Sequence, residues 1–228
     1  MIDSAFTGSP SSSVGDYLKA VWEIAGPSGE AAATKDVAAR LSVSPASVSN
    51  MFGRLQEMGL VRYERYRGAS LTEEGRTEAL RLVRRHRLIE TFLLEHLGYS
   101  WREVHEEAEK LEHAVSDEFT RRLAEFLGHP DQDPHGDPIP TAEGVLEPDY
   151  SLPLDQAEAG QRVRIFKVSD EDASALDYLG ERGLVPGREL TVKEMRALDG
   201  VVTVEDEEGG THSFGEPLAR FVFVRVEP

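Results

Sequence analysis

Apolar residues recur at helical spacing through the first part of the chain. One stripe runs through residues 13–24, a second through 34–41 and a third through 45–58. Repeats of three and four residues are typical of amphipathic helices that pack one face on a core. Thr34 can cap the second helix, and Pro45 suits the first turn of the third. The pattern therefore predicts three short helices in succession.

Two short strands, 60–63 and 69–71, are predicted next, on either side of the turn Glu64-Arg65-Tyr66-Arg67-Gly68. Two helices joined by a tight turn and followed by a hairpin form a winged helix-turn-helix, whose second helix enters the major groove of DNA. Short polar side chains on that helix can reach phosphates or base edges, and a basic wing can reach the backbone. The predicted DNA-contacting residues are Ala46, Ser47, Ser49, Asn50, Arg54, Arg65 and Arg67.

In the rest of the chain, the spacing of apolar residues changes from helical to alternating. Helices are predicted at about 72–96, 101–114 and 116–127, and residues 129–153 form a proline-rich linker. From Gly160 onward, short alternating runs and one helix near 173–182 predict a small β-barrel. The expected α+β fold therefore has a winged helix-turn-helix, a helical dimerisation domain and a C-terminal SH3-like barrel. The predicted boundaries are 1–74, 75–142, a linker at 143–159, and 160–228.

The distribution of charge makes DNA binding compatible with an acidic chain. The net charge is −17, yet residues 54–87 contain nine arginines and five acidic residues. A local basic patch can bind phosphate while an acidic remainder suppresses nonspecific contacts. The alternative is an arginine-rich face that is simply solvated. The sequence shows no signal peptide and no apolar run of transmembrane length, so a cytoplasmic location is expected.

Histidines and carboxylates gather on two of the predicted helices. His86 and Glu90 are four residues apart, so they share a face of the long helix. The next helix places four such residues on one stripe: His105, Glu109, Glu112 and His113. A helical stripe at these offsets is normally apolar, and burying charge there is unfavourable unless the groups coordinate something. A charged, solvated face is the alternative.

The ligand types favour a hard divalent metal. The chain has no cysteine, which excludes thiolate ligands and disulfides. Imidazole and carboxylate ligands suit Mn²⁺, Fe²⁺ or Zn²⁺, and an oxygen-rich set leans toward Mn²⁺.

Several segments resemble the diphtheria toxin repressor family of metal-dependent transcription regulators. A late glycine-rich stretch is similar to the family's SH3-like domain, which also occurs in ferrous-transport accessory proteins. The resemblance covers almost the whole chain and is carried by residues 14–18, 84–90, 104–113, 116–118 and 179–187.

The resemblance implies two metal sites. Asp16, Glu109, Glu112 and His113 match the regulatory site of the family. His86, Glu90 and His105 match a second, ancillary site, and Asp172 falls near the position where the SH3-like domain adds a carboxylate. Iron-responsive members have Met and Cys where this chain has Asp16 and Glu109, so the resemblance points to the manganese-responsive branch.

The resemblance also implies a homodimer that binds a palindromic double-stranded DNA operator when Mn²⁺ is bound. We expect a regulator of metal-homeostasis genes and no enzymatic activity. An iron-dependent repressor of the same family is the nearest alternative. A metalloenzyme that activates water with the His/Glu cluster, and a metal buffer or trafficking protein, are alternatives from other classes.

Overall fold

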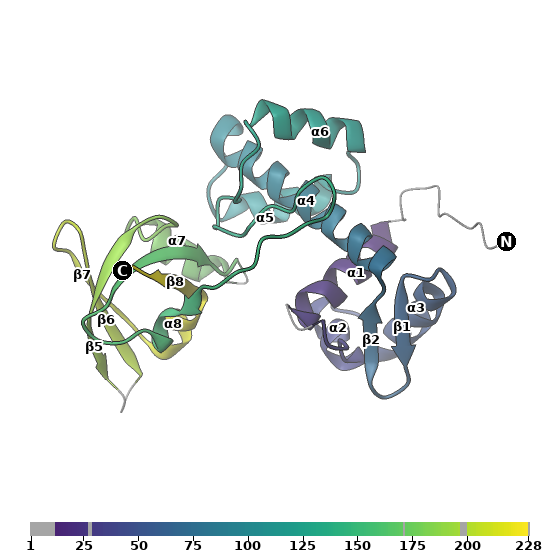
Figure 1. The fold of residues 1–228 in the computed structure, drawn as a ribbon, viewed down its shortest axis with the longest axis horizontal. Helices are drawn as coiled ribbons and strands as arrows, with labels where there is room; N and C mark the ends of the chain where they lie inside the picture. Colours follow the sequence, from purple (N-terminus) through teal and green to yellow (C-terminus); the bar gives the residue numbers. More distant parts are fainter. Residues whose placement is uncertain (1–11, 27–28, 171, 197–199, 228) are drawn as a thin grey trace. The chain divides into compact units, whose positions relative to one another are not determined.

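The computed structural model describes residues 12–26, 29–170, 172–196 and 200–227 (Figure 1). Its contacts divide the chain into two units. The first contains Met1–His86, Lys110–Ser116 and Pro140–Val145, and the second contains Arg87–Glu109, Asp117–Ile139 and Leu146–Pro228. The mixture of helices and two sheets confirms the predicted α+β class. In chain order the elements are α1 (Ser12–Ala25), α2 (Thr34–Arg40), α3 (Pro45–Glu57), β1 (Val61–Glu64), β2 (Gly68–Leu71), α4 (Glu73–Leu97), α5 (Glu103–Leu111), α6 (Asp117–Phe126), β3 (Leu152–Pro153), η1 (Leu154–Gln156), β4 (Arg162–Val168), α7 (Ala173–Gly180), β5 (Glu189–Arg196), β6 (Val201–Asp206), β7 (Thr211–Phe214), α8 (Glu216–Phe221) and β8 (Val222–Val226).

The first unit is a winged helix-turn-helix. Its core forms where the apolar stripes of α1, α2 and α3 meet the hairpin β1–β2, and Leu18, Val48 and Phe52 are fully buried there. Ser44 caps α3 by accepting a hydrogen bond from the backbone nitrogen of Ser47, so Pro45 occupies the first turn as expected. The predicted cap of α2 is wrong, because Thr34 is already helical and Ala33 precedes it without a side-chain cap.

Close backbone packing fixes the base of the wing. Ala32 and Ala69 exchange two backbone hydrogen bonds, of 2.8 and 3.0 Å. Gly68 has a φ of +106°, and a Cβ there would lie 2.1 Å from the carbonyl oxygen of Ala32. A Cβ at Gly75, at the start of α4, would lie 1.9 Å from the carbonyl oxygen of Leu60. Both positions therefore require glycine, and the hairpin is held against α1 and α4.

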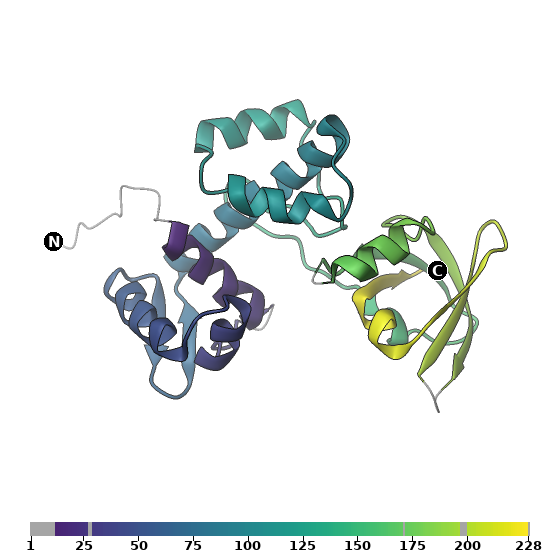
Figure 2. The same cartoon turned by 180° about the vertical axis from the view of Figure 1, so that it is seen from behind.

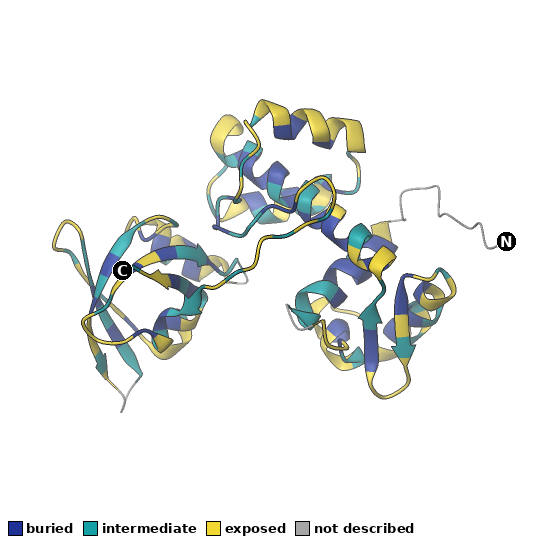
Figure 3. Cartoon of the chain, in the orientation of Figure 1, coloured by how far each residue is buried: buried dark blue, intermediate teal, exposed yellow. Residues whose placement is uncertain are grey.

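The second unit contains a six-stranded antiparallel sheet with the strand order β3-β8-β4-β5-β6-β7. Buried positions alternate with more exposed ones along β4, β5 and β6, as Figure 3 shows. Bulges in β4 and β5 bend the sheet into a barrel. Figure 2 shows α7 and α8 beside the sheet, and α7 contributes Leu176 and Leu179 to the barrel core. The small barrel predicted from the alternating runs is confirmed.

The stretch predicted as a proline-rich linker is partly built into this unit. Val168 of β4 donates a backbone hydrogen bond to the carbonyl oxygen of His135, and the indole nitrogen of Trp101 donates a hydrogen bond to the carbonyl oxygen of Pro134. A Cβ on Gly136 would lie 2.1 Å from the carbonyl oxygen of Phe166, so only glycine permits this approach. Further along, Leu154 is fully buried in the barrel core. No described helix is long and apolar enough to span a membrane.

Candidate metal centre and nucleic-acid interface

In the first unit, three potential metal ligands lie where the residues that follow α5 meet α1. The His113 Nε2 atom lies 2.6 Å from Oδ1 of Asp16 and 3.4 Å from Oε1 of Glu112. One ligand atom from each residue lies within 4.8 Å of the other two. We call Asp16, Glu112 and His113 the first centre. It joins residues 97 positions apart, and all three belong to the regulatory set that the resemblance implies.

The carboxylate of Glu112 has two different environments. Its side chain is fully buried, and Oε1 has no hydrogen-bond partner. A buried carboxylate oxygen without a partner is energetically unfavourable, and a cation is a natural partner for it. The other oxygen, Oε2, lies 2.6 Å from Nδ1 of His86 and 3.1 Å from Nζ of Lys19. His86, which the resemblance placed in the ancillary site, is therefore in contact with Glu112 within this unit.

Small residues and helix packing hold α1 in place at this centre. A Cβ on Gly15 would lie only 3.1 Å from Cε1 of His113, so the residue beside Asp16 has little room for a side chain. Burial, together with the charge of Asp16, raises the pKa of Tyr17. Because α1 also contacts α2, α3 and β2, an ion bound to Asp16 would be attached to the helix-turn-helix unit.

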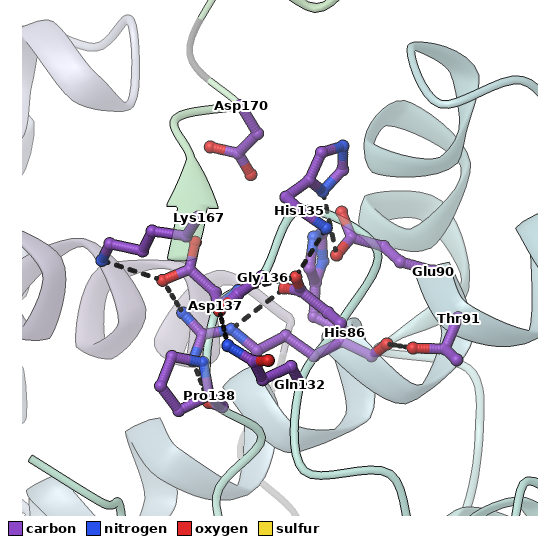
Figure 4. A network of polar contacts seen from close by, with 12 residues as sticks. His86, Glu90, Thr91, Gln132, His135, Gly136, Asp137, Pro138, Lys167 and Asp170 are labelled. Carbon is purple, nitrogen blue, oxygen red and sulfur yellow. Dashed lines mark hydrogen bonds and ion pairs between the residues drawn. The ribbon is translucent and has the colours of Figure 1, made fainter. Parts of the chain in front are cut away.

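A second cluster lies in the second unit, where α4, α5, the 131–138 loop and the end of β4 meet. In Figure 4, Glu90, His135 and Asp170 approach one another from these elements. We call the five residues of two overlapping ligand groups the second cluster: Glu90, His105, Asp133, His135 and Asp170.

His135 has the orientation of a metal ligand in this cluster. Its ring is 1% exposed, and Nε2 lies 3.1 Å from the carbonyl oxygen of Trp101. A carbonyl only accepts, so Nε2 carries the proton and Nδ1 has a lone pair. Nδ1 has no hydrogen-bond partner and lies 3.9 Å from Oε2 of Glu90. Fixing the tautomer through the other ring nitrogen is typical of histidines that bind metals.

Charges are concentrated around His135. Burial, followed by the charges of Glu90 and Asp137, raises the pKa of Asp133 well above its usual value. Arg87 offsets part of this negative charge, with Nε 3.5 Å from Asp133 and a terminal nitrogen 3.3 Å from Asp137. Asp137 also accepts a hydrogen bond from Lys167 of β4 (Figure 4). The basic side chains thus hold the loop while Asp133 lies beside Glu90 and His135.

His105 and Asp170 form an ion pair at the edge of the same cluster. The His105 Nδ1 atom lies 3.0 Å from Asp170 and 3.2 Å from Glu90. Burial alone would lower the pKa of His105, but its hydrogen bonds to Asp170 and Glu90 raise it to about 10. Burial would likewise raise the pKa of Asp170, but its hydrogen bond from His105 lowers it to about 2.

The structure does not place Asp172 with these residues. Its carboxylate accepts hydrogen bonds from the Ser174 hydroxyl and from the backbone nitrogens of Ser174 and Ala175, which caps α7 and holds the pKa of Asp172 below its usual value. Asp170, two residues earlier, extends from the end of β4 toward His105 instead. Of the two acids in this segment, the structure places Asp170, not the predicted Asp172, in contact with His105. Glu109 belongs to the second unit, where its Oε1 lies 3.8 Å from Nε2 of His105.

The predicted DNA-contacting residues lie on one helix and on the wing. Ala46, Ser47, Asn50 and Arg54 of α3 are exposed, whereas Ser49 is half-buried. Ser47 also shares a hydrogen bond with the Ser44 hydroxyl at the start of the helix.

The wing is basic and highly exposed. Tyr66 at its tip is 91% exposed, and the Arg65 guanidinium lies 5.2 Å from the centre of its ring. Arg67 forms an exposed ion pair with Glu64. A hollow of about 430 Å³ separates the wing from the helices and is lined by Ala33, Thr34, Lys35, Ser49, Tyr63, Arg65 and Tyr66. This surface offers cationic and hydroxyl groups to a nucleic acid.

A winged helix-turn-helix beside a cluster of metal-type ligands defines a metal-dependent DNA-binding regulator. The comparisons agree with this class. Residues 11–69 match the N-terminal DNA-binding domain of iron-dependent repressors, and residues 72–141 match their metal-binding and dimerisation domain. Residues 152–226 match the FeoA domain.

Individual relatives extend these matches. The chain is 32% identical to the iron-dependent repressor IdeR of Mycobacterium leprae over 77% of this chain and 81% of that protein. It is 31% identical to the diphtheria toxin repressor of Corynebacterium glutamicum over the same two shares. The chain belongs to the iron-dependent repressor family, of which the diphtheria toxin repressor is a member. It is a metal-dependent transcription regulator and not an enzyme, so the metalloenzyme alternative is wrong.

Solved structures show the same architecture. A manganese-dependent transcriptional repressor in complex with manganese is similar with a TM-score of 0.88 and 39% identity, over 94% of this chain and all of that one. The manganese regulator SloR is similar with a TM-score of 0.76 and 34% identity, over 96% of this chain and all of that one. The predicted winged helix-turn-helix, helical and SH3-like parts are confirmed, together with DNA binding and dimerisation as properties of the family.

Proposed function

We propose that this protein is a manganese-responsive repressor whose first centre binds the regulatory ion. The observation that carries the proposal is the buried Oε1 of Glu112, without a hydrogen-bond partner, beside the Asp16 and His113 pair. Carboxylate oxygens and an imidazole without sulfur favour a hard ion such as Mn²⁺. Two of the similar structures are of manganese regulators, which supports the same choice. An iron-responsive repressor remains the competing candidate, because the similar curated proteins include iron-dependent repressors.

The proposed mechanism couples metal binding to the position of α1. An ion shared by Asp16, Glu112 and His113 would join α1 to the segment after α5. Since α1 packs on α2, α3 and β2, the ion restricts the orientation of the DNA-binding helices. Metal then favours the DNA-competent arrangement by its differential affinity, and by linkage the operator tightens metal binding by the same factor.

We further propose that the second cluster binds another ion through Glu90, Asp133 and His135, with Asp170 and His105 at its border. The buried, unpartnered Nδ1 of His135 supports this proposal. The ion would join α4 to the 131–138 loop, which already packs on β4. Its contribution would be mainly to the stability of the second unit, because none of these residues lies in the winged helix-turn-helix.

We propose that two copies associate through the aromatic surface formed by α4 and α6. Phe126 is 64% exposed and Phe119 is 47% exposed. Phe126 contacts the rings of Phe92 and His96, with centroids 5.9 and 4.8 Å apart. Exposed aromatic clusters are typical of protein interfaces. A two-fold dimer would bind a palindromic operator in the cytoplasm, where it would control genes of metal homeostasis.

The proposal is tested by measuring operator binding by fluorescence anisotropy under anaerobic conditions, with Mn²⁺ or Fe²⁺ titrated into metal-free protein. The operator is first identified by footprinting on genomic DNA fragments. We expect Mn²⁺ to activate binding at least as fully as Fe²⁺. Activation by Fe²⁺ with no response at saturating Mn²⁺ would show that the regulatory metal is iron and not manganese. If no divalent metal changes the affinity for the operator, control of DNA binding by metal is rejected.

A further inference from the structure

Trp101, in the turn before α5, contacts both a helix of the barrel and a potential metal ligand. Its ring stacks on the ring of His135, with the two centroids 5.3 Å apart and the planes inclined by 23°. Trp101 also packs against the barrel core. A Cβ on Gly180, the last residue of α7, would lie 3.3 Å from the indole, so the small residue lets the ring approach α7 closely. Trp101 therefore connects α7 to the second cluster within one unit.

Three contacts of Trp101 act on the His135 ring. The backbone carbonyl of Trp101 accepts the hydrogen bond from Nε2, at 3.1 Å. Its indole nitrogen donates a hydrogen bond to the carbonyl oxygen of Pro134, at 2.9 Å, which holds the indole against the 131–138 loop. The stacked indole restricts rotation of the imidazole out of its plane. Nδ1, which has no hydrogen-bond partner, is thereby kept facing Glu90, whose Oε2 lies 3.9 Å away.

The backbone of His135 is held separately from its ring. Its nitrogen donates a hydrogen bond to the Asp133 carboxylate, and its carbonyl oxygen accepts one from Val168 of β4. Neither hydrogen bond acts on the imidazole. Once the backbone is fixed, the side chain can still rotate about its own torsions, and the carbonyl and ring of Trp101 restrict that rotation. The direction of Nδ1 therefore depends on Trp101.

The ring of Trp101 is also the main attachment of its turn to α7. The adjacent Arg102 forms an ion pair with Asp177 of α7, at 2.8 Å, but the two side chains are 58% and 46% exposed. Exposed ion pairs of this kind contribute little to stability. The contact between the Trp101 ring and Gly180 is partly buried, so it contributes more. A shift of α7 would therefore reach His135 through the indole.

On the basis of the ion proposed for the second cluster, we propose that Trp101 is a positioning residue of that cluster. Its ring, packed against Gly180 of α7, orients His135 so that Nδ1 is available to a divalent ion. Release of α7 from the turn would free the His135 ring. Docking of this barrel helix and binding of the ion therefore favour each other, by the same factor in both directions.

The first test observes the His135 ring in metal-free, full-length protein whose seven histidines are labelled with ¹⁵N. Long-range ¹H–¹⁵N spectra at mildly alkaline pH distinguish a ring protonated at Nε2 from one that exchanges between tautomers, and the His135→Gln variant identifies the signal. We expect the Nε2-protonated form in the wild type and a mixture in Trp101→Leu. Trp101→Phe keeps a stacking ring and should keep the wild-type signal. Trp22→Leu, which removes a tryptophan from the core of the first unit, is the control for lost stability.

The second test measures Mn²⁺ affinity by isothermal titration calorimetry in the Asp16→Ala background, in which the first centre lacks a ligand. We expect Trp101→Leu to weaken the binding of Mn²⁺ about 10- to 100-fold, as is typical when a group that orients a histidine ligand is lost. Trp101→Phe should recover most of this affinity. A merely structural role for the indole would lower Tm without changing either the His135 signal or the affinity of the folded protein.

Either an unchanged His135 signal or an unchanged Mn²⁺ affinity in a folded Trp101→Leu protein would overturn the proposal. If circular dichroism shows that Trp101→Leu is unfolded, Gly180→Val decides, because its side chain pushes on the indole from α7 and leaves every ligand in place. A wild-type signal and affinity in that variant would then overturn the proposal. If the Asp16→Ala protein binds no Mn²⁺ at all, the ion of the second cluster is rejected, and the metal-free spectra alone decide whether Trp101 orients His135.

Discussion

The first centre and the second cluster contain the same kinds of ligand atom in different surroundings. In the first centre Glu112 is buried, but the Asp16 and His113 side chains are 39% and 21% exposed. In the second cluster His105 and Asp170 are partly exposed, but Glu90 and His135 are each only 1% exposed. The first centre joins α1 to a distant segment, and the second lies among elements that already pack together. An exposed site between separate segments can change the position of one of them when an ion binds. A deeply buried site mainly adds stability to packing that exists without it.

The largest effect should follow from breaking the exposed site. Asp16→Ala removes the ligand on α1, so the ion can no longer hold the helix-turn-helix unit. We expect the protein to stay folded and dimeric but to lose its metal response, roughly a 5- to 150-fold loss of Mn²⁺-dependent operator affinity. Anisotropy with and without Mn²⁺ measures the change, and Glu106→Gln, at an exposed position of α5, is a control of similar charge change. Full metal-dependent binding by Asp16→Ala would mean that α1 is not part of the switch.

Removing a ligand from the second cluster should affect stability more than regulation. The His135→Gln variant loses the buried Nδ1 atom that would bind the ion. We therefore expect Mn²⁺ to raise its Tm by less than it raises the Tm of the wild type. Saturation at 100 times the Kd contributes about 2.7 kcal/mol of stability, which sets the scale of the lost rise. Differential scanning calorimetry measures it, with His129→Gln in the exposed part of the same segment as the control. An unchanged thermal shift would show that His135 holds no ion.

These two sites also show how far sequence reasoning reaches. Helices α1 to α7 were predicted from apolar stripes and caps, whereas α8 was not predicted. The stripe on the predicted helix 101–114 already grouped Glu112 with His113. Asp16 was matched through the resemblance, because periodicity along one helix says nothing about a partner 97 residues away. Asp133 and His135 were missed. They lie in a proline-rich stretch without periodicity, and only the docking of this loop through Gly136 brings them beside Glu90.

Neighbouring acids were also difficult to assign. Asp170 and Asp172 have the same chemistry, and a cap of α7 cannot be distinguished from a ligand until the end of β4 is located. The edge strand β7 was missed because its four residues, Thr211–Phe214, include only one apolar side chain. His86 was assigned by the resemblance to the ancillary site, and its contact with Glu112 depends on the packing of α4 against the end of α5.

Changing ligand hardness should show which metal the protein responds to. Asp16→Met together with Glu109→Cys replaces two carboxylates by softer sulfur ligands. We expect the ratio of Mn²⁺ to Fe²⁺ activation to fall about tenfold, because sulfur favours Fe²⁺ over Mn²⁺. Anaerobic anisotropy titrations of both proteins give the ratio. Equal preference in the double variant and the wild type would indicate that these two residues do not select the metal.

The smallest effect should come from the wing, which lies in the unit of the first centre but holds none of its ligands. Arg65 and Arg67 are exposed at a turn between short strands, so we expect them to contact phosphates rather than bases. Alanine at either position should weaken binding to operator and random DNA several-fold alike, and lower the slope of log affinity against log salt by about 0.9 for each lost contact. Arg67 already pairs with Glu64, so its substitution should cost less than that of Arg65. Salt titrations at saturating Mn²⁺ measure the slope, with Arg162→Ala, at an exposed position of β4, as the control. If random-DNA affinity stays intact while operator preference is lost, the arginines recognise bases, and the wing determines sequence specificity rather than general affinity.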